Sequence, residues 1–215
     1  MRQLLGKEIR LALHPTNLIF LSLSALLLVP DYPYYVVFFY TTLGLFFVCL
    51  TGRENHDIEY GLMLPVQKRS LVRGRVAFSV LIELAQLLLA VPFAILRGAI
   101  SPAPNAVGIE ANVAFFGFSL LLMGLYNLAF FPRYYRNPSR VGRAYLWGSV
   151  VFSLVMIVLE LLTHVQPFFR DRLDTPDPLY LGAKLAVLGL GAAAYLLLTW
   201  IAYRVSARRF ETLDL

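Results

Sequence analysis

Three polar side chains lie inside otherwise apolar stretches of the chain. Glu83 and Gln86 are about one helical turn apart in the apolar run 76–96, and Asn127 lies in the run 112–131. A polar or charged side chain at bilayer depth is costly, and it usually faces the interior of a helix bundle or a partner. Glu83, Gln86 and Asn127 are therefore candidates to line a polar path or an interface between subunits. The alternative is an internal contact between helices, in which Asn127 or a serine satisfies Glu83.

Two further charges lie near the ends of apolar runs. Glu160 is close to the end of the run 144–162, and Lys184 is close to the start of the run 179–203. Because consecutive spans reverse direction, these two residues are expected at a similar depth. We predict an ion pair between Glu160 and Lys184 that holds two helices together.

The segment 53–75 is charged and helix-prone, and it separates two long apolar runs. Its first half is acidic, with Glu54, Asp57 and Glu59, and its second half is basic. Pro65 would end a helix here, so only one or two helical turns can form. Such a segment is expected to be a docking surface for a soluble partner. The alternative is a solvated turn that only fixes which side of the membrane the loop occupies.

The residues needed for several kinds of catalysis are missing or scattered. No nucleotide-binding loop of the form GxxxxGK[ST] occurs in the sequence. Cys49 is the only cysteine, which excludes an intrachain disulfide and a cysteine-based zinc cluster. His14, His56 and His164 are too scattered to resemble a paired metal site, and Ser119 lacks the glycine that follows the serine in a nucleophile elbow. No cofactor is therefore expected on this chain.

The composition is that of a membrane protein. Of the 215 residues, 59% are hydrophobic and only 15% are charged, and the mean hydropathy is +0.67. A membrane-crossing helix needs about 20 mostly apolar residues. The apolar runs predict six spans, at about 16–30, 34–51, 76–96, 112–131, 144–162 and 179–203. We therefore expect an all-α membrane protein with one transmembrane domain over residues 1–215.

The ends of the predicted spans carry further signals. Residues 1–15 alternate basic and apolar side chains with a helical period up to Pro15, which predicts an amphipathic helix lying in the membrane interface. The run 179–203 has small residues on which another helix can approach closely. They are Gly182, Ala183, Ala186, Gly189 and Ala193.

Lys and Arg gather in alternate connections, and such residues mark the cytosolic side of a membrane protein. They lie in the N-terminal segment, the segment 53–75, the connection 132–143 and the C-terminal tail. Both termini are therefore expected to be cytoplasmic, in a multi-pass protein of the cell membrane. Although the formal net charge is +6, the basic residues lie between apolar runs, so nucleic acid is not an expected partner.

Residues 64–75, LPVQKRSLVRGR, carry a resemblance to a known family. A hydrophobic residue, Pro-Val, a basic pair and a further apolar and basic stretch leading into a span resemble permease subunits of type-2 ATP-binding-cassette (ABC) transporters. In that family an amphipathic N-terminal helix precedes six spans, and a cytosolic coupling helix after the second span docks on an ATPase subunit. The topology is similar over the whole chain, whereas the motif is sharp only over about residues 54–75.

The resemblance implies partners and site residues. The coupling loop would be residues 53–70, and its ATPase contacts would be Glu54, Asp57, Ile58, Glu59, Tyr60 and Leu62. ATP and Mg²⁺ would be bound by the separate ATPase, because this chain has no nucleotide loop. The polar path of Glu83, Gln86 and Asn127 would then be a transport path, completed by a second permease copy or a paralogue in a dimer.

The resemblance also implies a cargo. Short bacterial permeases of this kind export amphipathic or antimicrobial peptides, phenol-soluble modulins among them, which implies export of hydrophobic or amphipathic substrates by alternating access. Two other classes remain as alternatives from the residues alone. One is a six-span intramembrane enzyme, and the other is the membrane substrate-binding component of a vitamin uptake system.

Overall fold

The computed structural model describes residues 6, 15–63, 65–100 and 105–213, and the structural statements below concern this part of the chain. These residues form helices joined by short connections, with no β-strand among them. The elements are α2 (Pro15–Ser22), η1 (Leu23–Leu28), α3 (Tyr35–Glu54), α4 (Asp57–Met63), α5 (Lys68–Ile100), α6 (Val113–Tyr134), η2 (Pro138–Arg140), α7 (Val141–Val165), η3 (Phe169–Leu173) and α8 (Leu181–Glu211). The predicted interfacial helix over 1–15 lies outside the described residues, apart from Gly6 and Pro15.

Five helices are long and apolar enough to cross a membrane, namely α3, α5, α6, α7 together with η2, and α8. They confirm the predicted all-helical membrane fold. The first apolar run forms a shorter helix, Thr16–Leu28, in which α2 passes into the 3₁₀ segment η1. Asp31, with a φ of 52°, lies in the turn that leads into α3. Because a span needs about 20 residues, the described part of this run is too short to count as a sixth full span.

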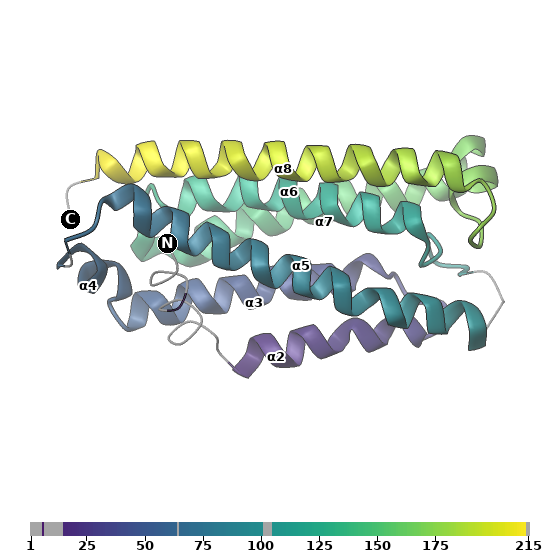
Figure 1. Cartoon of the computed structure of the whole chain (residues 1–215), viewed down its shortest axis with the longest axis horizontal. Coiled ribbons are helices and arrows are strands. Elements are labelled where there is room, and N and C mark those ends of the chain that lie inside the picture. Colours follow the sequence, from purple (N-terminus) through teal and green to yellow (C-terminus); the bar gives the residue numbers. More distant parts are fainter. Residues whose placement is uncertain (1–5, 7–14, 64, 101–104, 214–215) are drawn as a thin grey trace.

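Helix α5 links the two sides of the bundle. It begins beside the end of α8, where the Lys68 Nζ donates a hydrogen bond to the Leu213 carbonyl oxygen at 2.7 Å. It ends beside the start of α3, where the Arg97 Nε donates to the Tyr34 Oη at 2.8 Å. Its 33 residues therefore cross the bundle obliquely, and α5 diverges from α8 along its length (Figure 1).

Helix α6 forms the centre of the bundle and carries much of its aromatic core. The rings of Tyr126, Phe130 and Tyr134, spaced four residues apart on one face, stack with centroid distances of 5.3 and 5.7 Å. By contrast, α7 and α8 expose leucines on their outer faces, as expected of lipid-facing surfaces. These include Leu146, Leu154, Leu161, Leu190 and Leu196.

Helices α6 and α8 touch backbone to backbone through glycines. A Cβ atom added at Gly191 would lie 2.0 Å from the Gly117 carbonyl oxygen, and one at Gly117 would lie 2.7 Å from the Val187 carbonyl oxygen. The expectation that a small residue of the last helix allows another helix to approach closely is therefore confirmed. However, a Cβ added at Gly182 or Gly189 would meet nothing within 4 Å, so the close approach is made by a different glycine of α8.

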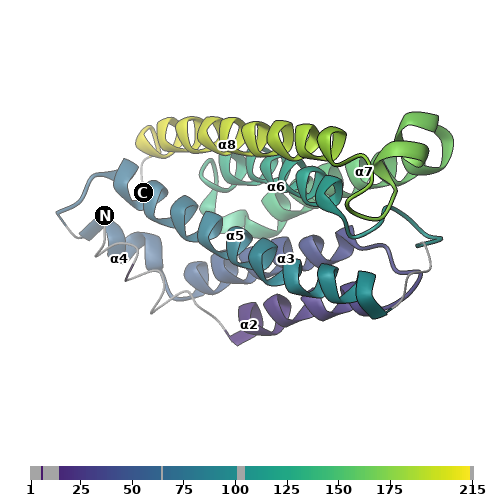
Figure 2. The same cartoon turned by 45° about the vertical axis from the view of Figure 1, so that its right-hand side comes forward.

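The bundle has two distinct ends (Figures 1 and 2). Helix α4, the start of α5 and the end of α8 lie together at one end, which we call the α4 end. The connections 105–112 and 166–180 lie at the opposite end, which we call the loop end. Helices α2 and α8 lie on opposite sides of the bundle in both views.

Candidate functional site

The short helix α4 lies where the sequence predicts a coupling helix, between α3 and α5. Asp57, in its first turn, forms an ion pair with Arg75 of α5. The Arg75 side chain is only 4% exposed, and its Nη1 also donates to the Val48 carbonyl oxygen of α3 at 3.3 Å. The Asp57–Arg75 pair thus joins α4 to both neighbouring helices.

Asp57 was predicted to contact an ATPase, and the structure shows that its carboxylate is engaged with Arg75. Its side chain is 14% exposed, and the predicted ATPase contact stays a prediction. Ile58 and Leu62 are also partly buried, and both pack against the core. The physical reason is that a helix of seven residues must bury one face to stay in place, and Asp57 shares that face.

The opposite face of α4 is open. Glu54 and Glu59 are exposed, and the apolar side chains of Tyr60 and Met63 are 64% and 78% exposed. Exposed aromatic and methionine side chains are enriched at protein-binding surfaces. Of the six predicted docking residues, Glu54 at the end of α3 and Glu59 and Tyr60 of α4 are thus exposed.

A hollow of about 270 Å³ adjoins this surface, between α4 and the connection from α6 to α7. Its lining includes Ile58 and Glu59 from α4 and Pro138 and Ser139 from η2. Arg53, at the end of α3, donates to the Ser139 carbonyl oxygen at 3.3 Å. The connection after α6 is therefore part of the same surface, which the sequence pattern did not indicate.

Glu83 occupies the centre of the bundle in a hydrogen-bonded network. Its Oε2 accepts a hydrogen bond from the Asn127 Nδ2 of α6 at 3.0 Å and one from the Tyr195 Oη of α8 at 2.6 Å. The Asn127 Nδ2 also lies 3.2 Å from the Thr199 Oγ1. All four residues are buried. The network joins α5, α6 and α8. It matches the alternative prediction that Asn127 satisfies Glu83 in a contact between helices.

Gln86 belongs to a separate contact. Its Nε2 donates to the Ser24 Oγ of η1 at 2.7 Å, on the side of α5 that faces the first apolar helix. Glu83 and Gln86 therefore lie on one helix but bond to different neighbours. The structure does not bring Gln86 into the Glu83 network.

The predicted ion pair between Glu160 and Lys184 is wrong. The buried Lys184 Nζ donates to the Asp177 Oδ1 at 2.8 Å and to the Thr175 carbonyl oxygen at 2.6 Å. Glu160 instead accepts a hydrogen bond from the backbone N–H of Ile109 at 3.1 Å. Both residues do lie near the loop end, but the loops that cover the helix ends supply partners closer than the facing helix.

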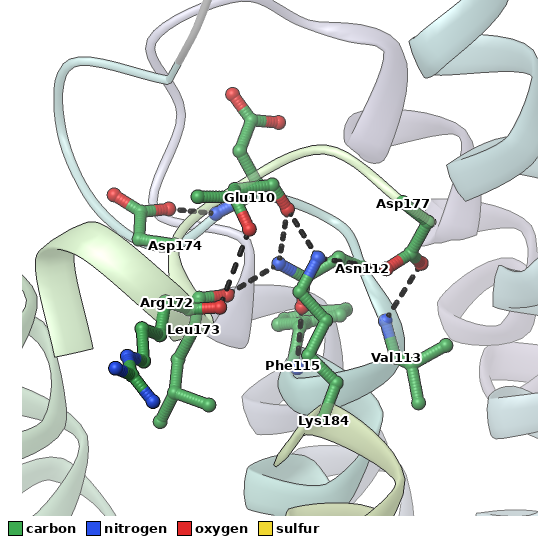
Figure 3. A network of polar contacts seen from close by, with 10 residues as sticks. Glu110, Asn112, Val113, Phe115, Arg172, Leu173, Asp174, Asp177 and Lys184 are labelled. Carbon is green, nitrogen blue, oxygen red and sulfur yellow. Dashed lines mark hydrogen bonds and ion pairs between the residues drawn. The ribbon is translucent and has the colours of Figure 1, made fainter. Parts of the chain in front are cut away.

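Asn112 is the centre of the polar cluster at the loop end (Figure 3). Its Oδ1 caps α6 by accepting from the Phe115 N–H at 3.1 Å, and its Nδ2 donates to the Leu173 and Thr175 carbonyl oxygens at 2.7 and 2.9 Å. The backbone N–H of Glu110 donates to the Asp174 Oδ1 at 2.8 Å. Two connections far apart in the sequence are thereby locked together.

The Asp174 carboxyl group in this cluster has a raised pKa. Burial raises the pKa of Asp174 to about 6, with the nearby Glu110 carboxylate adding to the rise and the hydrogen bond from the Glu110 N–H opposing it. Val113 donates its N–H to the Asp177 Oδ2 at 3.1 Å, so Asp177 serves both α6 and Lys184. The only sequence signal for this cluster was the density of acidic residues around 171–177.

A larger cavity of about 640 Å³ lies beside this cluster. Its walls are mainly apolar residues of α5, α6 and α8, and carboxylates lie at one end. The lining residues are Leu87, Val91, Ala94, Ile95, Gly98, Glu110, Ala111, Asn112, Val113, Phe116, Pro176, Asp177 and Leu188. The cavity lies in the region where α5 diverges from α8 (Figure 1), a geometry that hydropathy does not reveal.

Comparison with known proteins bears on the whole chain. Searches of curated proteins and of solved structures found no match. The family model described as ABC-2 family transporter protein matches residues 3–211, which is nearly the full length. Such proteins are membrane components of transporters that act with an ABC ATPase. Together with the five long apolar helices, this match shows that the chain belongs to the ABC-2 transporter family and is a membrane permease of an ABC transporter.

Proposed function

We propose that the chain is the permease subunit of an ABC exporter and that α4 is its coupling helix. The single observation that carries this proposal is the construction of α4. It combines an open acidic and aromatic face with a buried ion pair, Asp57–Arg75, that ties it to the core. A helix built this way can receive a force from a docked ATPase and pass it to α3 and α5.

The proposed cargo is hydrophobic or amphipathic, peptides among them. Support comes from the 640 Å³ cavity, whose apolar walls suit alkyl or apolar side chains and whose Glu110 and Asp177 carboxylates suit a cationic group. Exposed Ile95 on its edge leaves the cavity open to the side of the bundle.

A dimer is proposed because the centre of one chain is filled. The Glu83 network fills the space between α5, α6 and α8, and the aromatic core of α6 fills the side toward α3, where the Tyr126 Oη donates to the Thr42 carbonyl oxygen at 3.2 Å. A path across the membrane therefore requires a second surface, supplied by another copy or a paralogue. In this arrangement the α4 end is cytoplasmic, ATP binding brings two ATPase copies together, and the permeases alternate between two conformations.

The test is a charge reversal on α4. Glu59→Lys should reduce copurification with the partner ABC ATPase by about tenfold, since like charges at a docking surface cost well over 1 kcal/mol. Asp171→Lys is the matched control, because Asp171 is an exposed acid at the loop end and its reversal should leave assembly unchanged. Normal assembly of the Glu59→Lys permease, with normal stimulation of ATP hydrolysis, would rule out α4 as the docking site.

A further inference from the structure

Four arginines converge on one hollow at the α4 end, and only one of them, Arg136, also lines the hollow beside α4. They come from the end of α6, the connection after it and the start of α7. The hollow has a volume of about 410 Å³ and is lined by Arg133, Arg136, Asn137, Arg140, Arg143, Ala144 and Trp147. We call it the arginine hollow.

Among the described residues, no carboxylate neutralises the charge of the arginine hollow. Within the described part of the chain, no carboxylate forms an ion pair with any of its four guanidinium groups. Arg133 donates to the Ala129 carbonyl oxygen at 2.9 Å and lies 5.0 Å from the centre of the Trp147 ring. Arg136, Arg140 and Arg143 are exposed. Such a group of cations attracts an anion with several acceptor oxygens, which guanidinium groups bind in pairs of hydrogen bonds.

The surroundings of the hollow indicate where that anion comes from. Trp147 is 51% exposed, and tryptophan favours the headgroup zone of a bilayer. Leu146, Val150 and Leu154 follow on exposed surface of α7, so an apolar face runs from the hollow along the helix. A soluble anion would bind the guanidinium groups without contacting this apolar face, whereas a phospholipid contacts the guanidinium groups with its headgroup and the apolar face with its acyl chains.

We propose that the arginine hollow binds the phosphate headgroup of an anionic phospholipid whose acyl chains lie along the outer face of α7. Binding would bridge the end of α6 and the start of α7 across the connection between them. This proposal does not depend on the exporter function, because it requires only that the helices lie in a membrane.

The chain supplies its own fluorescent reporter for the test. It has two tryptophans, Trp147 and Trp200, so Trp200→Phe leaves Trp147 as the sole one. In nanodiscs of phosphatidylcholine, a small fraction of phosphatidylglycerol with brominated acyl chains should quench Trp147 several-fold more strongly than the same fraction of brominated phosphatidylcholine. Arg140→Ala should reduce this preference about fivefold, and Arg136, Arg140 and Arg143 all changed to Ala should abolish it.

Matched controls come from the same end of the molecule. Arg204 lies 5.3 Å from the Trp200 ring and, with Arg208 and Arg69, lines a hollow of only about 100 Å³. Because Arg69 there is paired with Glu211, Trp200 as the sole tryptophan should show a weaker preference. Changing Arg204 and Arg208 to Ala should leave the Trp147 preference intact.

Three outcomes would overturn the proposal. One is equal quenching of Trp147 by both brominated lipids, and another is a preference that survives both the single and the triple arginine substitution. The third is loss of the preference on addition of millimolar inorganic phosphate or of the purified ATPase, which would assign the hollow to a soluble anion or to an acidic protein surface.

Discussion

Asp57 and Arg75 are 18 positions apart, yet their pairing decides whether α4 is held in place. Both side chains are largely buried, so removing one leaves the other as an uncompensated charge, which typically costs 3–5 kcal/mol in total stability. Asp57→Ala should therefore loosen α4 and the start of α5. Hydrogen exchange of the amides of α4 should increase, while that of α8 should stay unchanged.

A second variant separates this prediction from general unfolding. Changing both Asp57 to Asn and Arg75 to Met removes the charges together, and it should restore much of the protection that Asp57→Ala loses. If the single variant keeps wild-type exchange in α4, the pair does not hold this helix.

Asp174 gives the loop end a dependence on pH. Burial raises its pKa from 3.8 to about 6, so the folded protein binds this proton more tightly than the unfolded chain. The stability that Asp174 contributes is thus fully present below about pH 4, falls as the pH rises toward 6 and is lost above it. Between pH 7.5 and pH 5, the thermal midpoint of the wild type should rise relative to that of Asp174→Asn.

Asp171 provides the control for this titration. Its pKa is lowered by the hydrogen bond from Arg170, so its protonation lies below the pH range tested. Asp171→Asn should therefore shift the midpoint by the same amount at pH 5 and pH 7.5. A flat difference between wild type and Asp174→Asn would contradict the role of Asp174.

At the scale of helices, the contact between α6 and α8 depends on Gly191. A methyl group there would overlap the Gly117 backbone, which cannot move as a side chain can, so Gly191→Ala should destabilise the bundle by about 1–3 kcal/mol. Gly189→Ala, two residues away in open space, should be neutral or slightly stabilising. Thermal unfolding in detergent compares the two directly, and equal midpoints would contradict the close backbone contact.

The helices themselves were largely predictable, because hydropathy over about 20 residues reports membrane spans directly. The runs predicted for the second to sixth spans all lie within or closely match observed helices. The first run, predicted at about 16–30, also matches a helix, but Thr16–Leu28 is shorter than a full span. Composition also could not show which glycine of α8 meets α6, because that depends on how the helix is rotated.

At the scale of the whole molecule, the partners of charged residues were the least predictable feature. Glu160 and Lys184 both lie near the loop end, as predicted, but they do not pair with each other. Glu160 accepts from the Ile109 N–H, and Lys184 donates to Asp177. The partners come from connections that cover the helix ends, and the path of a connection depends on the whole three-dimensional fold. For the same reason, the sequence could not show that Asp57 pairs with Arg75 while Glu59 and Tyr60 of the same short helix stay exposed.

The glycine contact between α6 and α8 has a consequence for how the molecule can move. Two helices in backbone contact cannot slide past each other without collision, so α6 and α8 form one rigid body. Helix α5 is bonded to this frame through Glu83 and at the α4 end, whereas the 640 Å³ cavity separates its loop-end half from α6 and α8. A conformational change driven from α4 would therefore bend α5 near Glu83, with its loop-end half moving against a fixed α6–α8 frame.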